Sequence, residues 1–175
     1  IITIDSEEGL EIMRHTLAAQ VLARAVKNLY PKSKLAIGPT IKDGFYYDVE
    51  CKETISIDDL EKIEKEMDKI VKTKSSITKK LLSKKDALKV FKDKDESYKE
   101  EIINDSDQED EFQLYYQDDE DFVDLCKGPH LPNLNFIGAY KLTTISGAYW
   151  KGDSSNTMLT RIYGTAWSNE KDLNE

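Results

Sequence analysis

The stretch LCKGPH, residues 125–130, places a thiol and an imidazole four positions apart. Cys126 is one of two cysteines in the chain, and His130 is one of two histidines. Such a pair suits a metal site, a nucleophile with its base, or simple packing in a turn. Gly128 and Pro129 interrupt a helix, so the pair does not share a helical face. The stretch follows a predicted strand instead, and strand ends often carry functional residues.

A metal site has few candidate ligands in this sequence. Structural zinc normally takes four Cys or His ligands, and the chain offers His15, Cys51, Cys126 and His130. Cys51 is distant in sequence from the pair, so a closed site is not expected. A three-ligand catalytic zinc stays open, without support from a second closely spaced pair. His15 is expected midway along a buried helix, where an imidazole needs a function or a hydrogen-bonding partner.

The elements that must position these residues run from helix to mixed structure to strands. Residues 5–31 predict a long helix, capped by Asp5 and ended by Pro31, with apolar residues nearly all round its middle. Such a helix is buried at the centre of a domain. We therefore predict an α+β fold, with an antiparallel sheet wrapped around this helix and additional amphipathic helices. The further predicted elements are strands in 34–50, a helix from Ser56, a strand in 75–82, a helix from Ser83 to Phe91, helical turns in 98–103, and strands in 112–116, 121–126, 139–152 and 158–167.

Charge is unevenly distributed along the chain, which has a net charge of −9. Nine acids and no Lys or Arg lie between Asn104 and Asp121, and we expect this acidic segment to be a mobile loop that does not contact RNA. Residues 62–94 hold twelve lysines against five acids. A solvated helical face and a phosphate-binding surface both remain open for these lysines. The overall charge argues against a dedicated nucleic-acid clamp but leaves room for a local contact.

The sequence predicts one domain over residues 1–175, with linker-like ends at 1–4 and 168–175. The first methionine is Met13, so we interpret the chain as a piece of a longer protein. No apolar run approaches the roughly 20 residues of a membrane span, and no signal peptide opens the chain. Two cysteines make no disulfide framework, which favours a cytoplasmic protein without a membrane partner.

Five stretches of the chain occur in an order that resembles a known family. They are EGLEIMRH, AIGPTIKDGFYYD, YKEEII, DLCKGPHLPN and SGAYWKGDSSNTMLTRIYGTAW. Together they look like the editing domain of bacterial-type threonyl-tRNA synthetases, which is similar to alanyl-tRNA synthetase editing domains. Both kinds share a helix-borne HxxxH and a later CxxxH, and CKGPH supplies the second motif here. The resemblance implies hydrolysis of serine misattached to threonine tRNA, because one methyl group gives only roughly 1–3 kcal/mol of discrimination.

The resemblance also implies roles in a hydrolytic pocket, which needs a positioned water, a proton relay and donors for the oxyanion. His130 and Lys99 are expected to matter more than Cys126, because water attacks the ester directly. On residue type alone Lys99 reads as a surface lysine, and Arg161 as a structural ion-pair partner without a catalytic role. The catalytic candidates are His15, Lys99, Cys126 and His130, and the substrate-binding candidates are Thr16, Gln20, Tyr47, Tyr115 and Asp124.

The long helix departs from the family motif between His15 and Gln20. Counted forward from EIMRH, His15 takes the first histidine position and Ala19 replaces the second. Counted back from VLARAVKNLYP, Thr16 and Gln20 take these positions, because the chain is one residue longer. The extra residue rotates the following helix by about 100°, so both registers hold only with a bulge such as a π-type turn. Neither register has both histidines, so zinc is disfavoured and no metal ligand is predicted.

The resulting hypothesis is a deacylase domain that acts on the seryl ester at the acceptor end of threonine tRNA. Two alternatives remain: a degenerate, non-catalytic module that binds the acceptor end, and a zinc-dependent free-standing deacylase of the alanyl-editing type. No cofactor is expected in this chain. By resemblance, ATP, magnesium and zinc belong to an aminoacylation core outside it, and the full-length protein forms a homodimer through that core.

Overall fold

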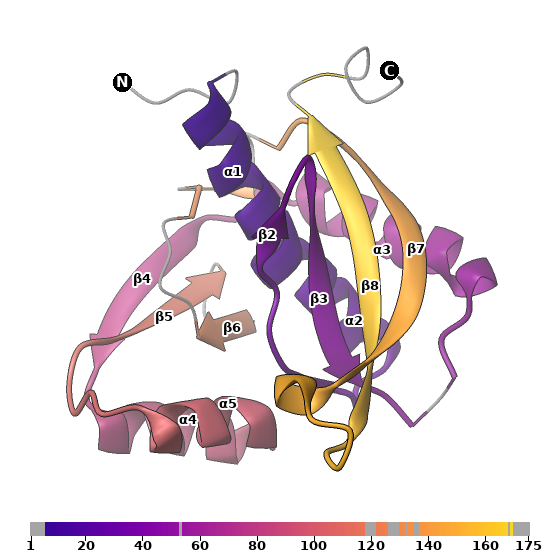
Figure 1. Cartoon of the computed structure of the whole chain (residues 1–175). Helices are drawn as coiled ribbons and strands as arrows, with labels where there is room; N and C mark the ends of the chain where they lie inside the picture. Colours follow the sequence, from indigo (N-terminus) through magenta and orange to yellow (C-terminus); the bar gives the residue numbers. More distant parts are fainter. Residues whose placement is uncertain are drawn as a thin grey trace.

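A long central helix organises the molecule (Figure 1). In this computed structural model it consists of α1 (Glu7–Thr16), the π-helix η1 (Leu17–Leu22) and α2 (Ala23–Leu29), joined without a break. Its cap is Ser6 rather than the predicted Asp5, since the Ser6 side chain accepts a hydrogen bond from the backbone N–H of Gly9 at 3.0 Å. The structure describes residues 6–52, 54–117, 122–125, 130–131, 133–134, 137–167 and 169.

The π-helix is a bulge of the kind that lets both registers of this helix hold, which the sequence left open. A π-type turn holds one more residue than an α-type turn, so it absorbs the extra residue while the helical faces before and after it keep their orientation. All six residues of η1 are buried, and Gln20 is the one polar side chain among them. The bulge therefore lies inside the core, where packing from several sides holds it.

A five-stranded antiparallel sheet covers one side of the central helix (Figure 1). The strand order is β1-β3-β8-β7, and β2 also pairs with β3. At the β2–β3 turn, a Cβ atom added to Gly44 would lie 2.2 Å from the carbonyl oxygen of Gly164, so this close approach of β3 and β8 requires glycine. The strands are β1 (Lys34–Leu35), β2 (Thr40–Ile41), β3 (Gly44–Glu50), β7 (Ala139–Tyr149) and β8 (Met158–Trp167).

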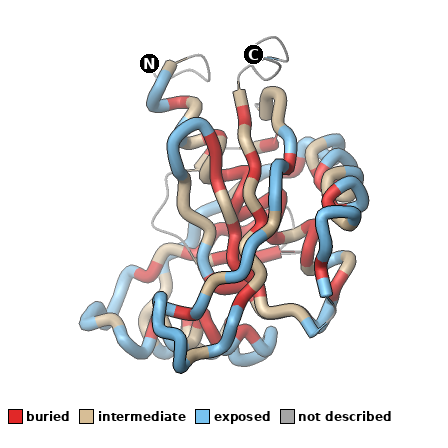
Figure 2. The backbone as a smooth tube through the Cα atoms, turned by 45° about the vertical axis from the view of Figure 1, so that its right-hand side comes forward, coloured by how far each residue is buried: buried red, intermediate tan, exposed pale blue. Residues whose placement is uncertain are grey.

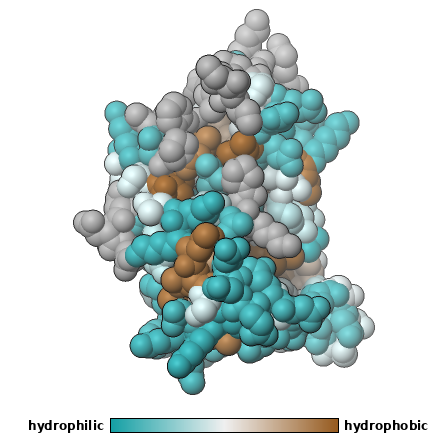
Figure 3. All heavy atoms as spheres, turned by 90° about the vertical axis from the view of Figure 1, so that its left-hand side faces the viewer, coloured by the Kyte–Doolittle hydropathy of each residue, from teal (hydrophilic) through white to brown (hydrophobic). Residues whose placement is uncertain are grey.

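A second antiparallel sheet, with the order β4-β5-β6, lies on the other side of the central helix (Figure 1). The α+β class and the sheets around the helix are as predicted, but there are two separate sheets rather than one. Two short helices, α4 and α5, pack against the second sheet. Seen from this side, the surface is mostly hydrophilic with small hydrophobic patches (Figure 3). The elements are β4 (Ile77–Leu82), α4 (Lys84–Asp93), α5 (Ser97–Asp105), β5 (Phe112–Gln117) and β6 (Phe122–Leu125).

Two main hydrophobic clusters correspond to these two layers. The larger one surrounds the central helix and includes residues of α3 (Leu60–Lys72). A capping box of Ser56 and Asp59 starts the short 3-10 helix η2 (Ile57–Asp59), which leads into α3. The smaller one lies between the α4–α5 pair and the β4–β6 sheet and contains Phe91 and Ile103. Buried residues concentrate in the interior strands and helix, and exposed residues in the outer helices and turns (Figure 2). Within the described residues, no helix is long and apolar enough to cross a membrane.

The predicted acidic loop is partly regular structure. Asp105 ends α5 and forms an ion pair with Lys151 at 2.6 Å, and the segment from residue 112 onward forms β5. Glu109 lies 3.8 Å from Lys84. The loop prediction was wrong for Asn104 and Asp105, which end α5, whereas β5 confirms the strand that the sequence also predicts over 112–116. Residues 118–121 and the predicted linker-like ends lie outside the described residues, Asn169 excepted.

Candidate active site

A cleft of about 610 Å³ opens where the central helix meets α5, β5 and β6. Its walls therefore come from both layers of the fold, with His15 and Ala19 on the central helix and Lys99 on α5. The 37–39 segment before β2 closes one side. The other lining residues are Ile102, Ser106, Gln108, Glu111, Phe112, Gln113, Asp124 and Leu125.

A buried ion pair lies in the wall of this cleft. The Lys99 ammonium contacts Asp124 Oδ1 at 2.7 Å, and the two side chains are 4% and 2% exposed. The Tyr47 hydroxyl donates to Asp124 Oδ2 at 3.0 Å, and the backbone N–H of Leu125 donates to Oδ1 at 2.8 Å. Lys99 is therefore not a surface lysine, because its side chain reaches inward from α5 to the Asp124 carboxylate of β6. Three donors on one carboxylate offset the cost of removing its charge from water.

The Lys99 ammonium keeps hydrogen-bonding capacity toward the cleft. An ammonium group has three donors, and in the described part of the chain Asp124 is its one hydrogen-bonding partner. The ammonium also lies 5.5 Å from the centre of the Tyr47 ring. A positive group in this position can bind water or a developing negative charge.

The tautomer of His130 follows from the hydrogen bonds of Thr16. The Thr16 hydroxyl donates to the carbonyl oxygen of Ile12 at 2.9 Å, so its single proton is used. Its oxygen accepts from the backbone N–H of Leu131 and lies 3.1 Å from His130 Nδ1. The Nδ1 atom must therefore carry the ring proton and donate it to Thr16, which leaves Nε2 as an acceptor.

His130 is a partly buried, neutral imidazole. Removal from water, and secondly the neighbouring His15, lowers the pKa of His130 to about 3. The two histidine rings lie 4.7 Å apart, and the Tyr115 ring meets the His130 ring edge-on at 4.5 Å. Within the described residues, Nε2 is buried without a hydrogen-bonding partner. This ring can accept a proton or orient water, but it lies behind His15 and does not line the cleft.

The residues of the two registers of the central helix lie in different places in the structure. His15 and Ala19 line the cleft, whereas Thr16 and Gln20 do not. Gln20 is fully buried, and its side-chain and backbone oxygens accept from Gln117 Nε2 at 3.1 and 2.8 Å. The structure therefore brings the first register to the cleft and turns the second toward β5 and the segment that holds His130.

Among the remaining predicted site residues, Tyr115 packs beside Asp124 and Cys126 lies outside the described residues. Tyr115 and Asp124 are register partners in β5 and β6, and the Tyr115 hydroxyl donates to Gln113 Oε1 at 3.1 Å. A search of the described residues finds no group of three or more His, Cys, Asp or Glu side chains that could hold a metal ion.

Arg161 has the structural role that the sequence predicts. Its guanidinium contacts both carboxylate oxygens of Asp48, at 2.8 and 3.0 Å, and lies over the Tyr46 ring. This pairing raises the pKa of Arg161. It ties β8 to β3 rather than lining the cleft.

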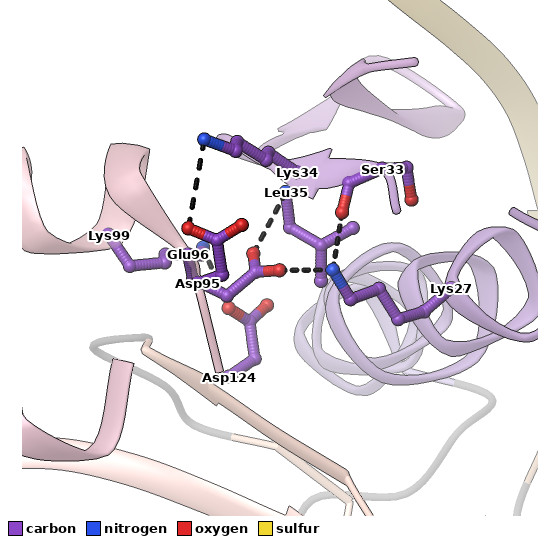
Figure 4. A network of polar contacts seen from close by, with 8 residues as sticks. All are labelled: Lys27, Ser33, Lys34, Leu35, Asp95, Glu96, Lys99 and Asp124. Carbon is purple, nitrogen blue, oxygen red and sulfur yellow. Dashed lines mark hydrogen bonds and ion pairs between the residues drawn. The ribbon is translucent and has the colours of Figure 1, made fainter. Parts of the chain in front are cut away.

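Sequence analysis missed Glu96, which helps to place α5. Glu96 precedes α5, is 3% exposed, and accepts hydrogen bonds from Lys27 and from the backbone N–H of Leu35 (Figure 4). Burial raises the pKa of Glu96, while Lys27 acts against this rise. Lys99 follows Glu96 by three residues, so the same turn of chain carries both. The sequence signal, an acid just before a short helix, is too common to have identified it.

Gln117 was also missed and holds the central helix against β5. It is fully buried, and its carboxamide oxygen accepts from Arg24 Nη1 at 2.7 Å while its nitrogen donates to Gln20. A glutamine at the end of a predicted strand carries no sign of this role, because both of its partners are about 100 residues earlier in the chain.

Comparisons with known proteins agree on one family. Residues 113–163 match the family described as "Threonyl and Alanyl tRNA synthetase second additional domain". The chain is 51% identical over 175 residues to a threonine–tRNA ligase of Francisella philomiragia, and 46% and 49% identical over 173 residues to those of Prochlorococcus marinus and Coxiella burnetii. These alignments cover 99–100% of the chain and 26–27% of each relative, so the chain spans about a quarter of their length. Residues 113–163 are therefore similar to this family, and the whole chain is similar to about a quarter of each of these threonine–tRNA ligases.

Proposed function

We propose that this chain is a deacylase domain that hydrolyses serine misattached to threonine tRNA. The single observation that carries the proposal is the buried Lys99–Asp124 pair in the wall of the cleft, with Tyr47 as a third member. Burying two charges is costly, and a cleft with a buried ammonium and carboxylate suits a charged, polar substrate. The threonine–tRNA ligase relatives supply the class of substrate.

In the proposed reaction, water attacks the ester carbonyl between serine and the terminal ribose. Lys99 stabilises the negative charge that grows on the carbonyl oxygen, with donors that Asp124 leaves unused. Among the described residues, Asp124 Oδ2 accepts one hydrogen bond, from Tyr47, so it retains capacity for the ammonium or hydroxyl group of serine. His15 lines the cleft and contacts the His130 ring, and this pair orients the water or relays its proton.

No covalent intermediate is part of this proposal. A cysteine nucleophile requires an activating base and a lowered pKa, whereas water can attack an activated ester directly. Cys126→Ser is therefore expected to retain much of the activity. A trapped acyl-enzyme on Cys126 would contradict this mechanism.

A second candidate function is binding of the tRNA acceptor end without catalysis. The observation that favours it is Ala19, which lines the cleft at the position where the family motif has its second histidine. A zinc-dependent deacylase is the third candidate, and elemental analysis with a His130→Ala control separates it from the other two.

A deacylation assay on seryl- and threonyl-tRNA separates these functions. We expect the chain to release serine faster than threonine, and Lys99→Met to slow release by a factor of about 10²–10³. Lys85→Ala, an exposed lysine on α4, serves as the matched control and should leave the rate unchanged. Binding of tRNA without accelerated release would instead support the non-catalytic module.

The proposal also sets the wider context of the domain. In the full-length protein, we propose that the domain serves a cytoplasmic threonine–tRNA ligase that dimerises through its aminoacylation core. The partner of the domain itself is the acceptor end of threonine tRNA.

A further inference from the structure

A second cleft, of about 670 Å³, lies beyond the start of α5 from the candidate active site. It is formed by the end of α2, the following 31–33 segment, the ends of β1 and β3, and the turn between α4 and α5. Five of its lining residues are lysines. They are Lys27, Lys32, Lys34, Lys52 and Lys94.

Among the described residues, two of these five lysines have an ion-pair partner and three do not. Lys27 pairs with the buried Glu96, and Lys34 lies 3.9 Å from Asp95. Lys32, Lys52 and Lys94 are exposed and have no ion pair with any described residue. Against them the cleft offers the carboxylates of Glu50 and Asp95. Positive charge therefore exceeds negative charge in a concave surface, where the electrostatic potential is strongest.

A buried hydroxyl group is the second, independent sign of a ligand. Ser33 lines this cleft and is 1% exposed, yet its Oγ atom has no hydrogen-bonding partner in the described part of the chain. An unpaired buried hydroxyl destabilises a fold. The backbone around it is well bonded, since the Ser33 carbonyl oxygen accepts from Lys27 and its N–H donates to the carbonyl oxygen of Tyr30. The side chain alone lacks a partner.

We propose that the lysine cleft binds phosphate groups, as an RNA backbone presents them. Phosphate oxygens accept from ammonium groups and from a serine hydroxyl, and lysine acts on phosphate as a point charge. Contacts of this kind position a nucleic acid without reading its sequence. The inference that phosphate binds here rests on the residues of the cleft. The choice of RNA as the source of that phosphate rests on the proposed function.

The position of the cleft suits a second contact with the same ligand. The Glu96 carboxylate accepts a hydrogen bond from Lys27, which lines the lysine cleft. Three residues after Glu96 in the sequence is Lys99, which lines the candidate active site (Figure 4). Lys94 and Asp95, just before α5, line the lysine cleft, and Lys99 within α5 lines the active-site cleft, so the two clefts are joined by a short stretch of chain. RNA that is held by its backbone in the lysine cleft would keep its end close to the active site.

The proposal is tested with an acceptor-stem RNA hairpin that carries no amino acid. Its binding to the chain is measured by fluorescence anisotropy at several salt concentrations. The variant Lys32→Ala/Lys52→Ala/Lys94→Ala should bind more weakly and reduce the salt slope by about 0.7–0.9 for each lost contact. The control Lys72→Ala/Lys85→Ala/Lys89→Ala removes the same charge from exposed positions of α3 and α4 and should bind nearly as the parent chain does. Equal losses in both variants, or none in the first, would overturn the proposal.

Ser33→Ala tests the hydroxyl separately from folding. Removing an unpaired buried hydroxyl should leave the midpoint of thermal unfolding unchanged or raise it. The affinity for the hairpin should fall by about fivefold, the size of one net hydrogen bond. Ser33→Thr keeps the hydroxyl and should restore much of this affinity. An unchanged affinity in Ser33→Ala would show that the hydroxyl is not a ligand.

Competition distinguishes RNA from free phosphate as the source. Inorganic phosphate and pyrophosphate are titrated against the chain while the backbone amide signals of Ser33 and Lys52 are followed by NMR. Shifts that the hairpin also produces, at lower concentration, support an RNA site. Shifts with pyrophosphate alone would replace RNA with a small phosphate ligand. Because the hairpin carries no ester, these results do not depend on whether the chain hydrolyses seryl-tRNA.

Discussion

Asp124 accepts hydrogen bonds from several parts of the candidate site. Its carboxylate accepts from Lys99, Tyr47 and the backbone N–H of Leu125, and these donors come from three different strands and helices. A buried carboxylate stays charged only when such donors replace water. The proposed catalytic role and stability are therefore coupled at this residue.

Replacing Lys99 alone should destabilise the protein as well as inactivate it. Lys99→Met leaves the Asp124 charge buried without its main partner, which typically costs about 3–5 kcal/mol. The double variant Lys99→Met/Asp124→Asn removes both charges and should recover part of this loss in urea unfolding, yet remain inactive in deacylation. If the double variant were less stable than the single one, the charge-burial argument would fail.

The partly buried, neutral imidazole of His130 should make stability depend on pH. Its pKa is about 3 in the folded chain and 6.5 in the reference state, so between these values the unfolded chain binds the extra proton. The free energy of unfolding therefore rises with pH across this window. The contribution of His130 to it is fully present above pH 6.5 and is lost on acidification. The slope in the middle of the window is about 1.4 kcal/mol per pH unit.

His130→Asn isolates this contribution, since asparagine does not titrate. Urea unfolding at pH 7, 6, 5.5 and 5 should show the parent chain losing stability faster than the variant. Tyr115→Phe, which alters a neighbour of the ring without removing the imidazole, should keep the slope of the parent chain. Parallel curves for parent and His130→Asn would show that His130 is not buried in neutral form.

At the scale of elements, the π-helix decides which side chains reach the cleft. An α-helix with one extra residue would rotate everything beyond it, so either the His15 side or the α2 side would lose its packing. The π-type turn keeps both. Its consequence is local: Ala19 lines the cleft, while Gln20 is held by Gln117.

Histidine introduced at the two neighbouring positions should therefore behave differently. Ala19→His directs its ring toward the open cleft beside His15, so we expect a small effect on stability and a rise in the deacylation rate. Gln20→His breaks the bonds to Gln117 and places a larger ring in a packed interior, which should cost about 1–3 kcal/mol. Thermal unfolding and deacylation of both variants test this. A stable Gln20→His and an unstable Ala19→His would reverse the assigned register.

At the scale of the whole molecule, the site is built where two layers meet. His15 and Tyr47 belong to the larger hydrophobic cluster and its surroundings, whereas Lys99 and Asp124 lie on elements that pack on the smaller one. Glu96 is one of the links between them, since it binds Lys27 of α2 and the backbone of β1. The relative position of the layers should thus affect activity from a distance.

Glu96→Ala should lower deacylation although Glu96 does not line the active-site cleft. The substitution leaves the backbone N–H of Leu35 without its acceptor, at a cost of about 1–3 kcal/mol, and releases the start of α5. Glu96→Gln keeps an acceptor for Leu35 and should restore much of the activity. The rate at saturating substrate is the decisive measurement, because Lys99 placement affects the chemical step. Full activity of a folded Glu96→Ala would exclude this role.

The sequence by itself determined most of the elements and showed where a bulge could occur. Short-range contacts specify local structure at several places in the chain. Examples are the apolar residues nearly all round the helix in 10–29, the amphipathic pattern of α3 and the Ser83 cap, and the structure agrees with all three. The one-residue mismatch around Ala19 is likewise local, so counting residues gave two registers, and the structure shows the π-type turn that reconciles them. The family resemblance came from the same kind of short stretches.

Only the tertiary structure decided which residues form the cleft. Lys99 reads as a surface lysine because α5 is short and charged, and its burial depends on Asp124, 25 positions later. Glu96, Gln117 and Ser33 carry no distinctive local pattern, since their partners or lack of partners arise from distant segments. The division of the strands into two sheets is of the same kind, because alternation specifies a strand but not its neighbour. Desolvation acts on the assembled molecule, and it selects these few side chains out of many similar ones.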